Sequence, residues 1–371
     1  MKGLLFAAAA LVLAAPVLAA PPQVTGRAYV VENGATGEVL LARDAHERVP
    51  IASITKLMTV LLTVERTRPS DVVTVSERAA EVGESSANLR AGERLTVREL
   101  LEAALIQSAN DAADALADYV GKGDEERFVA LMNQRARQLG LRDTHYVRPD
   151  GLDATGHVSS ARDVTLLARI LMHRPLVRQI VRQRAATISG GRTLRTWNDL
   201  LSSYPGIFGV KTGHTSTAGW NEVAAARRGP LTVYATLLGS PDRGERNDDL
   251  AKLLDWAFSR YRPATVVSKG HPYARAAVGY GHKPVALVAA VSLTPTLRVD
   301  FPLVRRVAAM DTAKLPVSRG QSLGQVRVYQ RGKLVGVVPL VASRSVSRPG
   351  LAGRVGWYAT RTLHHMWGWV S

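Results

Sequence analysis

Residues 50–62, "PIASITKLMTVLL", combine one serine and one lysine with a helical pattern of apolar residues. The apolar residues that recur at helical spacing are Ile54, Leu57, Met58, Leu61 and Leu62. Lys56 therefore follows Ser53 by one helical turn and lies on the same face of the predicted helix. The chain contains 9 Lys and 39 Arg, so lysine is the uncommon choice for a positive charge.

The choice of lysine over arginine at position 56 has a chemical consequence. Arg keeps its proton, whereas a buried Lys can lose it and act as a base. Lowering a lysine pKa from ~10.4 to ~7 takes roughly 4–5 kcal/mol, and a helix dipole supplies only ~0.3–1 kcal/mol. Burial and a second cation must do most of this, so we expect another positive group near Lys56. The alternative is a serine cap followed by a solvated lysine.

Two other segments carry candidate reactive groups. Lys211-Thr212-Gly213 lies on a predicted strand with small residues that let a ligand approach the backbone, and Lys211 is the candidate second cation. Ser108-Ala109-Asn110 lies at a junction between two predicted helices, which holds side chains rigidly and can expose them to a cleft. The alternatives are an exposed strand lysine beside a turn glycine and a helix-capping pair. For Ser108-Ala109-Asn110, taken alone, the capping pair is favoured.

The order of predicted elements between residues 26 and 262 indicates an α+β fold. A β-hairpin is predicted over 26–47 with its loop at Asn33–Gly37, and a Thr96–Glu99 capping box opens a helix over 95–110. Strands at both ends with helices between predict an antiparallel sheet covered by helices. The other predicted elements are helices ending at Gly121 and Gly140, a helix capped by Ser160, the strands "GIFGVKTGHT", "GWNEVAAA" and "LTVYATLLG", and a helix over 246–261.

The composition changes after residue 262. Short apolar runs separated by Gly and Pro predict a small all-β domain over 263–349, with a hairpin turn at Arg331–Gly332. Pro349–Gly350 then breaks the chain before a final segment, 350–371.

Residues 1–19, "MKGLLFAAAALVLAAPVLA", are typical of a secretory signal. Lys2 is the charged start, residues 4–15 are the apolar region, and Val17 and Ala19 are the small residues of a cleavage site. Mature protein is expected to start at Ala20, outside the cytoplasm. The alternative is a buried N-terminal helix.

The composition excludes some kinds of chemistry and favours one kind of partner. The chain has no Cys, which excludes thiolate catalysis and disulfides, and its 9 His show no metal-ligand spacing. Of the net charge of +17, residues 266–371 carry +13, from 15 Lys or Arg and the acids Asp300 and Asp311. For an exported chain, an anionic lipid or envelope polymer is favoured over nucleic acid.

Together and in this order, the three segments resemble those of the penicillin-binding proteins and serine β-lactamases. The closer resemblance is to the low-molecular-mass D-alanyl-D-alanine carboxypeptidases, serine peptidases that trim peptidoglycan stems. "ASITKLMT", "LIQSANDAADALA", "GLRDTHYVRPDGLDATGHVSSARD" and "GVKTGHTSTAGWN" carry it. It implies a β-lactamase/transpeptidase-like catalytic domain over 20–262, followed by the small β domain over 263–349.

The resemblance implies roles for three catalytic groups. Ser53 would be the nucleophile that attacks the D-Ala–D-Ala carbonyl, and Lys56 would take its proton. Ser108 would relay a proton to the leaving amine. The resemblance implies no cofactor and no metal, and it implies that β-lactam antibiotics are covalent inhibitors.

The resemblance also implies a set of substrate-binding groups. Asn110 would hold the acyl-chain amide, and Lys211 with Thr212 would bind the terminal carboxylate, while Lys211 also lowers the pKa of Lys56. The backbone N–H groups of Ser53 and His214 would form the oxyanion hole. The substrate-binding positions are Asn110, Lys211, Thr212, Gly213 and His214.

Two positions depart from the family pattern. "PDG" at 149–151 has an unusual middle residue, and the Ser-x-Asn triplet has Ala109 at its centre. Neither removes a catalytic group, so only fine specificity is in question.

Three alternatives from other classes remain. A β-lactamase needs a glutamate for fast deacylation, and between Asn110 and Lys211 the only glutamates are Glu125 and Glu126, in a charged helix start. A D,D-endopeptidase differs only in its leaving group, although such relatives usually lack the β domain. A scaffold that binds an anionic polymer predicts no acyl-enzyme at Ser53.

The C-terminal segment 350–371 predicts an amphipathic helix at a membrane surface. A central Arg361 would cost ~2.5–3.5 kcal/mol in a spanning helix, so the segment is expected to lie in the interface with its cations on lipid headgroups. The alternative is a helix packed on the β domain. One predicted face holds Leu351, Val355, Ala359, Leu363, Met366, Trp367, Trp369 and Val370, and the other holds Arg354, Arg361, His364 and His365.

Overall fold

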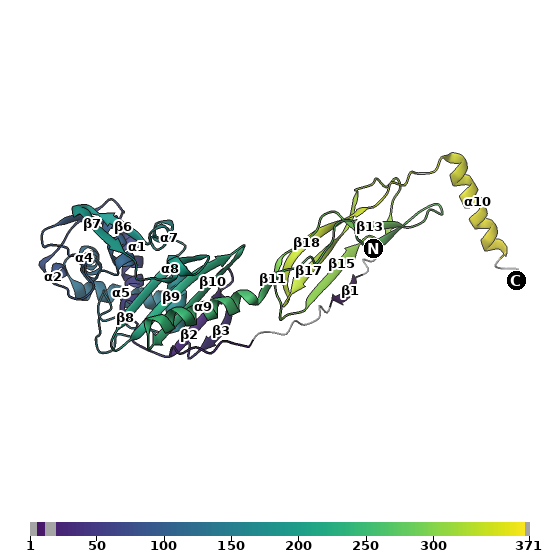
Figure 1. Ribbon diagram of the computed structural model, residues 1–371. Coiled ribbons are helices and arrows are strands. Elements are labelled where there is room, and N and C mark those ends of the chain that lie inside the picture. The colour runs from purple at the N-terminus through teal and green to yellow at the C-terminus, as the bar shows by residue number, and fades with distance from the viewer. Residues whose placement is uncertain (1–5, 12–19, 368–371) are drawn as a thin grey trace. The chain divides into compact units, whose positions relative to one another are not determined.

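The structure is a computed structural model that describes residues 6–11 and 20–367 (Figure 1). By its internal contacts the chain divides into two compact units, with the division between Ser259 and Arg260. We call residues 20–259 the helix–sheet unit. Residues 260–367, together with residues 6–11, are the β unit.

The helix–sheet unit is built on one antiparallel sheet with strand order β3–β2–β10–β9–β8. The strands are β2 Ala28–Asn33, β3 Val39–Arg43, β8 Ile207–Thr215, β9 Gly219–Arg228 and β10 Leu231–Ser240. Residues 233–238 of β10 are all buried, so both faces of the sheet are covered. The predicted hairpin loop at residues 33–37 joins β2 and β3.

Helices cover this sheet and form a second layer beside it. Helix α9 packs against β9 and β10, α6 packs against β2 and β10, and α1 contacts α4, α5 and α6. The helices are α1 Lys56–Arg66, α2 Glu77–Ala80, α3 Val97–Glu102, α4 Asn110–Gly121, α5 Glu125–Leu139, α6 Ala161–Leu171, α7 Pro175–Ile180, α8 Leu200–Ser203 and α9 Arg243–Ser259. Two short ribbons complete the unit, β4 Val72–Thr74 with β5 Arg94–Thr96 and β6 Ala185–Ile188 with β7 Arg192–Arg195.

The helix ends confirm several local predictions. Thr96 and Glu99 form the predicted capping box, and the Ser160 side chain accepts a hydrogen bond from the Asp163 N–H. Gly140 closes α5 in the left-handed conformation. After α4 that conformation falls on Lys122, one residue beyond the predicted Gly121.

The helix predicted over 95–110 begins at Val97, changes its geometry in its second half and ends at Gln107. After α3 the chain forms a π-helical turn, Ala103–Gln107, and Ser108 then adopts a left-handed conformation with φ 66°. The Ala109 N–H accordingly bonds back to the Ala103 carbonyl at 3.1 Å. Such π turns recur where a helix is distorted at a functional site, and this one ends at a candidate residue.

The β unit contains a seven-stranded sheet with order β1–β15–β17–β18–β13–β12–β16. Its neighbouring strands are antiparallel except β12 and β16. The strands are β1 Phe6–Leu11, β12 Pro272–Val278, β13 Val285–Ala289, β15 Leu303–Ala309, β16 Thr312–Ala313, β17 Ser322–Gln330 and β18 Lys333–Ala342, with a separate pair of β11 Tyr261–Pro263 and β14 Thr296–Arg298. Arg331 and Gly332 both have positive φ, as a two-residue hairpin turn requires, which confirms that turn.

The sequence predicts a secretory signal at one end of the chain and an amphipathic helix at a membrane surface at the other. The middle of the predicted apolar region forms β1, which pairs with β15 from Phe6↔Ala308 to Leu11↔Leu303. The predicted cleavage site at Val17 and Ala19 lies outside the described residues, so removal of residues 1–19 stays a prediction.

At the other end, α10 runs over Leu351–Trp367, and residues 368–371 of the predicted amphipathic segment lie outside the description, as do the side chains from residue 360 on. The ring of Trp357 meets that of Tyr280 edge to face, with 5.4 Å between the ring centroids, so the first half of α10 contacts the segment between β12 and β13. Among the helices of residues 20–367, none has the length and apolar character needed to cross a bilayer.

Candidate active site

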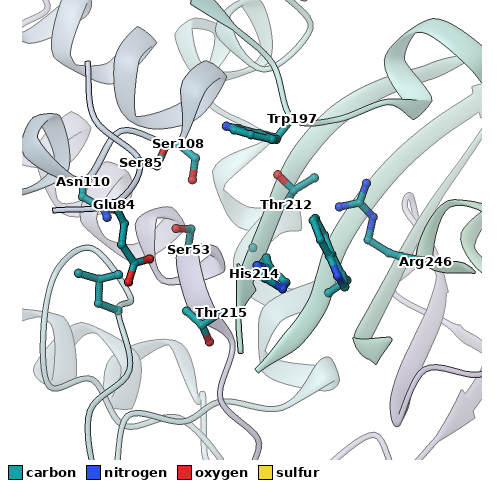
Figure 2. A pocket seen from close by; sticks show the side chains of 13 residues that line it. Ser53, Glu84, Ser85, Ser108, Asn110, Trp197, Thr212, His214, Thr215 and Arg246 are labelled. Atoms are coloured by element: carbon teal, nitrogen blue, oxygen red, sulfur yellow. The ribbon is translucent and has the colours of Figure 1, made fainter. Parts of the chain in front are cut away.

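One cleft of the helix–sheet unit, with a volume of about 230 Å³, collects side chains from three distant parts of the chain (Figure 2). Ser53 comes from the 3-10 turn Ala52–Thr55 that precedes α1. Ser108 and Asn110 come from the junction before α4, and Thr212 comes from β8. The structure therefore brings together the three segments that the sequence singled out.

Two glycines allow the chain to close around the Ser53 turn. A Cβ on Gly213 would lie 2.9 Å from the Ile51 carbonyl oxygen and 3.0 Å from the Ser53 nitrogen, so β8 contacts this turn backbone to backbone. A Cβ on Gly151 would lie 2.2 Å from the Ala52 carbonyl oxygen, and Gly151 has φ +87°. Only glycine fits at both positions, which explains why "KTG" and "PDG" each end in glycine.

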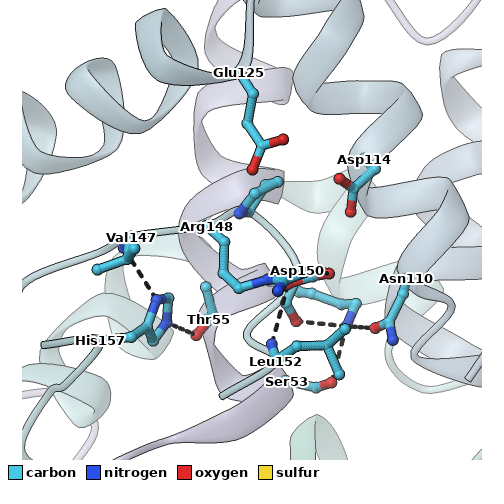
Figure 3. Close-up of polar contacts among 12 residues, drawn as sticks. Ser53, Thr55, Asn110, Asp114, Glu125, Val147, Arg148, Asp150, Leu152 and His157 are labelled. Carbon is cyan, nitrogen blue, oxygen red and sulfur yellow. Dashed lines mark hydrogen bonds and ion pairs between the residues drawn. The ribbon is translucent and has the colours of Figure 1, made fainter. Parts of the chain in front are cut away.

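Lys56 is fully buried and uses all three of its donors, and its partners Ser53, Asn110 and Asp150 are labelled in Figure 3. Its Nζ donates to Ser53 Oγ at 2.8 Å, to Asn110 Oδ1 at 2.6 Å and to the main-chain oxygen of Asp150 at 2.7 Å. The ammonium is therefore held in one position by side chains and backbone. The predicted contact between Lys56 and Ser53 is present.

Burial lowers the pKa of Lys56 to about 8. The charges of Asp150, Asp114 and Asp111 act in the opposite direction, and the charge of Arg148 acts in the same direction as burial. A lysine with this pKa is neutral in roughly one-tenth of the molecules at pH 7. Lys56 can therefore accept a proton from Ser53 at neutral pH without leaving its site.

Lys211 lies in a second buried serine–lysine pair. Its Nζ donates to Ser108 Oγ at 2.8 Å and to the Thr212 carbonyl oxygen at 2.8 Å. Burial, and next the charge of Lys56, lower the pKa of Lys211 well below its usual range. We predicted that Lys211 is the cation that lowers the Lys56 pKa. In the structure the charge of Arg148 also lowers the pKa of Lys56, and because repulsion between the two buried lysines is mutual, the predicted effect of Lys211 on Lys56 stays a prediction.

An ionic network that contains two buried carboxylates lies beside Lys56, and sequence reasoning missed it. Arg148 Nε and Nη2 donate to the two carboxylate oxygens of Asp150 at 2.6 and 2.7 Å. Burial opposes ionisation of Asp150, but the hydrogen bonds and charge of Arg148, with the charge of Lys56, lower its pKa. Burial, with the charge of Asp150, raises the pKa of Asp114 to about 7. Asp150 is the middle residue of "PDG", so the signal was visible but was assigned to fine specificity alone.

The Asn110 side chain and the nearby loop define one wall of the cleft. Asn110 Nδ2 donates to the Gly83 carbonyl oxygen at 2.9 Å, and its N–H donates to the Ser85 carbonyl oxygen at 2.7 Å. Asn110 Oδ1 is directed to Lys56, so the amide orientation is set by both partners. Glu84 also lines this wall and is exposed.

The opposite wall is aromatic and cationic (Figure 2). The ring of His214 stacks on Trp220 with 4.0 Å between centroids, and Trp197 lines the same side of the cleft. Arg246 from α9 also lines the cleft, although only 1% of it is exposed, and its Nε lies 3.1 Å from Glu222 Oε2. No motif spacing links Arg246 to the other segments, and only the packing of α9 on β9 places it here.

A serine–lysine pair that faces a second serine–lysine pair across a cleft, at the edge of an antiparallel sheet with helices, is the arrangement of the class formed by penicillin-binding proteins and serine β-lactamases. Comparison with known proteins agrees. Residues 15–242 match the family model described as D-alanyl-D-alanine carboxypeptidase, and residues 261–348 match that of the penicillin-binding protein 5 C-terminal domain. The chain belongs to the D-alanyl-D-alanine carboxypeptidase family, and it is a hydrolase of the peptidase class.

Individual relatives extend this likeness over most of the chain. The D-alanyl-D-alanine carboxypeptidase DacF of Bacillus subtilis is 33% identical over 85% of this chain and 84% of that protein. The crystal structure of penicillin-binding protein 5 from Haemophilus influenzae is 28% identical, covers 89% of this chain and 100% of that chain, and has a TM-score of 0.64. The Streptomyces K15 DD-transpeptidase is 32% identical, covers 65% of this chain and 100% of that chain, and has a TM-score of 0.62. The predicted family, fold class and peptidase class are confirmed.

Proposed function

We propose that the chain removes the terminal D-alanine from peptidoglycan stem pentapeptides through an acyl-enzyme on Ser53. The observation that carries the proposal is the 2.8 Å hydrogen bond between Ser53 Oγ and a buried Lys56 whose pKa is about 8. Residues 20–262 are the catalytic domain of this proposal, residues 263–349 its β domain and residues 350–371 its membrane-contacting segment.

Acylation begins when neutral Lys56 takes the proton of Ser53. The Ser53 Oγ then attacks the carbonyl carbon of the penultimate D-alanine and forms a tetrahedral oxyanion. The backbone N–H groups of Ser53 and His214 stabilise this oxyanion, and each such donor is worth roughly 2.7–4 kcal/mol of barrier. The C–N bond breaks as Ser108 gives its hydroxyl proton to the leaving amine, Ser108 regains a proton from Lys56, which is neutral again, and D-alanine departs.

Deacylation repeats the chemistry with water. Lys56 takes a proton from the water, whose oxygen attacks the ester carbon, and Ser53 Oγ recovers a proton as it leaves. We assign the acyl-chain amide to Asn110 in both steps, since Asn110 lines the cleft and its Oδ1 accepts a hydrogen bond from Lys56. Lys56 is thus the proton carrier in each half-reaction.

The terminal carboxylate of the substrate is bound by the cationic wall. We assign this role to Lys211 and Thr212, with Gly213 providing the close backbone approach, and we add Arg246, which lines the cleft. Guanidinium and carboxylate groups form paired, charge-assisted hydrogen bonds, so Arg246 favours substrates with a free carboxylate.

The competing activities differ in the leaving group and in the residue that activates water for deacylation. A D,D-endopeptidase would release a larger amine from the same acyl-enzyme. A β-lactamase needs a carboxylate that activates water, and Glu84, which precedes Asn110 in the chain, lines the cleft. Glu84 is exposed at the cleft wall, so we expect slow hydrolysis of β-lactams and their action as covalent inhibitors.

We also propose that the protein is exported and attached peripherally to a membrane with an anionic surface. On the first half of α10, Leu351 and Val355 are 76% and 63% exposed, and Arg354 lies on the same helix. Exposed apolar residues with cations on one short helix favour an interfacial position. Sedimentation with phosphatidylglycerol vesicles tests this, and equal binding by a chain that ends at residue 349 would contradict it.

The experiment that tests the catalytic proposal measures free D-alanine released from a pentapeptide ending in D-Ala–D-Ala. Residues 20–349 and the same protein with Ser53→Ala are compared. Release that disappears in the variant is the expected result. No release by the unsubstituted protein would contradict it, and a β-lactam adduct on Ser53 would then separate an endopeptidase from a non-enzymatic scaffold.

A further inference from the structure

A second hollow of the helix–sheet unit, with a volume of about 590 Å³, shares no lining residue with the active-site cleft. It lies where the C-terminal end of α6, helix α7, the start of β8 and the β9–β10 hairpin meet. Phe208 lines it, whereas Gly213, five residues further along β8, lines the active-site cleft. Five residues of a strand span about 17 Å, so the two sites are separate.

Four arginines surround this hollow, and no carboxylate is among its lining residues. Among the described residues, Arg169, Arg182 and Arg227 have no hydrogen-bond or ion-pair partner for their side chains, and Arg178 donates only to the Met172 carbonyl oxygen at 2.9 Å. Some other arginines of this unit are paired with carboxylates. Arg78, for example, contacts three carboxylates, those of Asp114, Asp118 and Glu125.

The backbone is shaped so that these groups face the hollow. A Cβ on Gly37 would lie 2.1 Å from a guanidinium nitrogen of Arg169, and a Cβ on Gly34 would lie 2.9 Å from the ring of Tyr234. The β2–β3 turn therefore leaves room for both side chains. Only 6% of Tyr234 is exposed, yet its hydroxyl has no hydrogen-bond partner among the described residues. The Tyr234 hydroxyl is accessible from the hollow, and beside guanidiniums without carboxylate partners it can donate to a ligand with several acceptor oxygens.

We propose that this hollow binds a ligand that carries two linked phosphate groups. Guanidinium groups form paired hydrogen bonds with phosphate oxygens. In an organic diphosphate the linking phosphate carries one negative charge and the terminal phosphate, like a monoester, about −1.5 to −2 at pH 7, so the four arginines supply enough positive charge to neutralise the ligand. Phe208, Ile207 and Met172 add apolar surface, and a volume in the range of ~300–1,000 Å³ holds an organic group as well. The ligand is therefore an organic diphosphate, bound independently of the reaction at Ser53.

The test measures binding of inorganic diphosphate to the full chain by calorimetry at one fixed, low ionic strength. The variant Arg182→Gln/Arg227→Gln removes two cations of the hollow. The control Arg94→Gln/Arg127→Gln removes two exposed arginines that likewise have no side-chain partner among the described residues. Acylation of Ser53 by a β-lactam, unchanged in both, shows that each variant is folded.

We expect saturable binding that weakens on the order of 100-fold in the first variant and stays unchanged in the control. Inorganic phosphate should bind more weakly than diphosphate. Absence of saturable binding, or equal weakening in both variants, would overturn the proposal, as would equal affinity for phosphate and diphosphate. Phosphatidylglycerol vesicles that bind through these arginines, without any binding of free diphosphate, would also overturn it and assign the hollow to lipid headgroups.

Discussion

The rate of Ser53 acylation should rise with pH through a midpoint near 8. The lowered pKa of Lys56 means that its neutral, proton-accepting form becomes populated as the pH increases through that value. At pH 7 about one-tenth of the plateau rate is expected, and at pH 9 about nine-tenths. The assay is the second-order rate constant for acylation by a β-lactam, measured between pH 6 and pH 10.

Replacing Asp150 in one variant and Arg148 in another should move this midpoint in opposite directions. Asp150 raises the pKa of Lys56 and Arg148 lowers it, so Asp150→Asn shifts the midpoint down and Arg148→Gln shifts it up. A unit charge ~6–8 Å away is worth about 2–3 kcal/mol at an effective dielectric constant of 20, which corresponds to about 1.5–2 pKa units. In Asp150→Asn, Asp114 loses the charge that raises its own pKa, ionises more readily and offsets part of the shift. We therefore expect a fall of roughly one unit in that variant.

The two variants also differ in their expected stability, which must be measured alongside. Arg148→Gln leaves the buried carboxylate of Asp150 without its paired partner, a change that typically costs about 3–5 kcal/mol. A profile that is flat from pH 6 to pH 10 would refute Lys56 as the base. Midpoints that move in the same direction in both folded variants would refute the electrostatic account of its pKa.

Three further results are expected. Gly213→Ala should lower the acylation rate at least tenfold and the free energy of unfolding by about 1–3 kcal/mol, because the new methyl group meets the Ile51 carbonyl oxygen at 2.9 Å; normal acylation would show that the turn adapts. Arg246→Gln should reduce kcat/KM for peptides with a free terminal carboxylate more than for their amides, and an equal reduction for both would remove Arg246 from carboxylate binding. Thr96→Ala should lower the free energy of unfolding by about 0.5–2 kcal/mol in urea without changing acylation, since it removes a helix cap and touches no group of the cleft.

Features that depend on a few consecutive residues could be read from the sequence. The Thr96–Glu99 capping box and the Arg331–Gly332 hairpin turn were predicted because their hydrogen bonds and dihedral angles are local. The strands and helices around the site also followed from periodicity. Ser53 and Lys56 were predicted to lie in one site because one helical turn separates them.

Features that depend on distance and burial could not be read in this way. The helix predicted over 95–110 ends early, in a π turn that sets Ser108 toward Lys211, and that contact joins residues 103 positions apart. The aspartate of "PDG" contributes both a carbonyl bond and a charge to Lys56 from 94 positions away. Arg246 reaches the cleft only because α9 packs on β9.

The sequence by itself determined the fold class, the family and the three segments that carry the reactive groups, because periodicity, caps and motif spacing are properties of short stretches. Only the tertiary structure decided which charges act on Lys56 and on Lys211, and which unpaired arginines meet at the second hollow. The physical reason is that a pKa depends on the depth of burial and on the distance to every nearby charge. Those quantities exist only once the chain has folded.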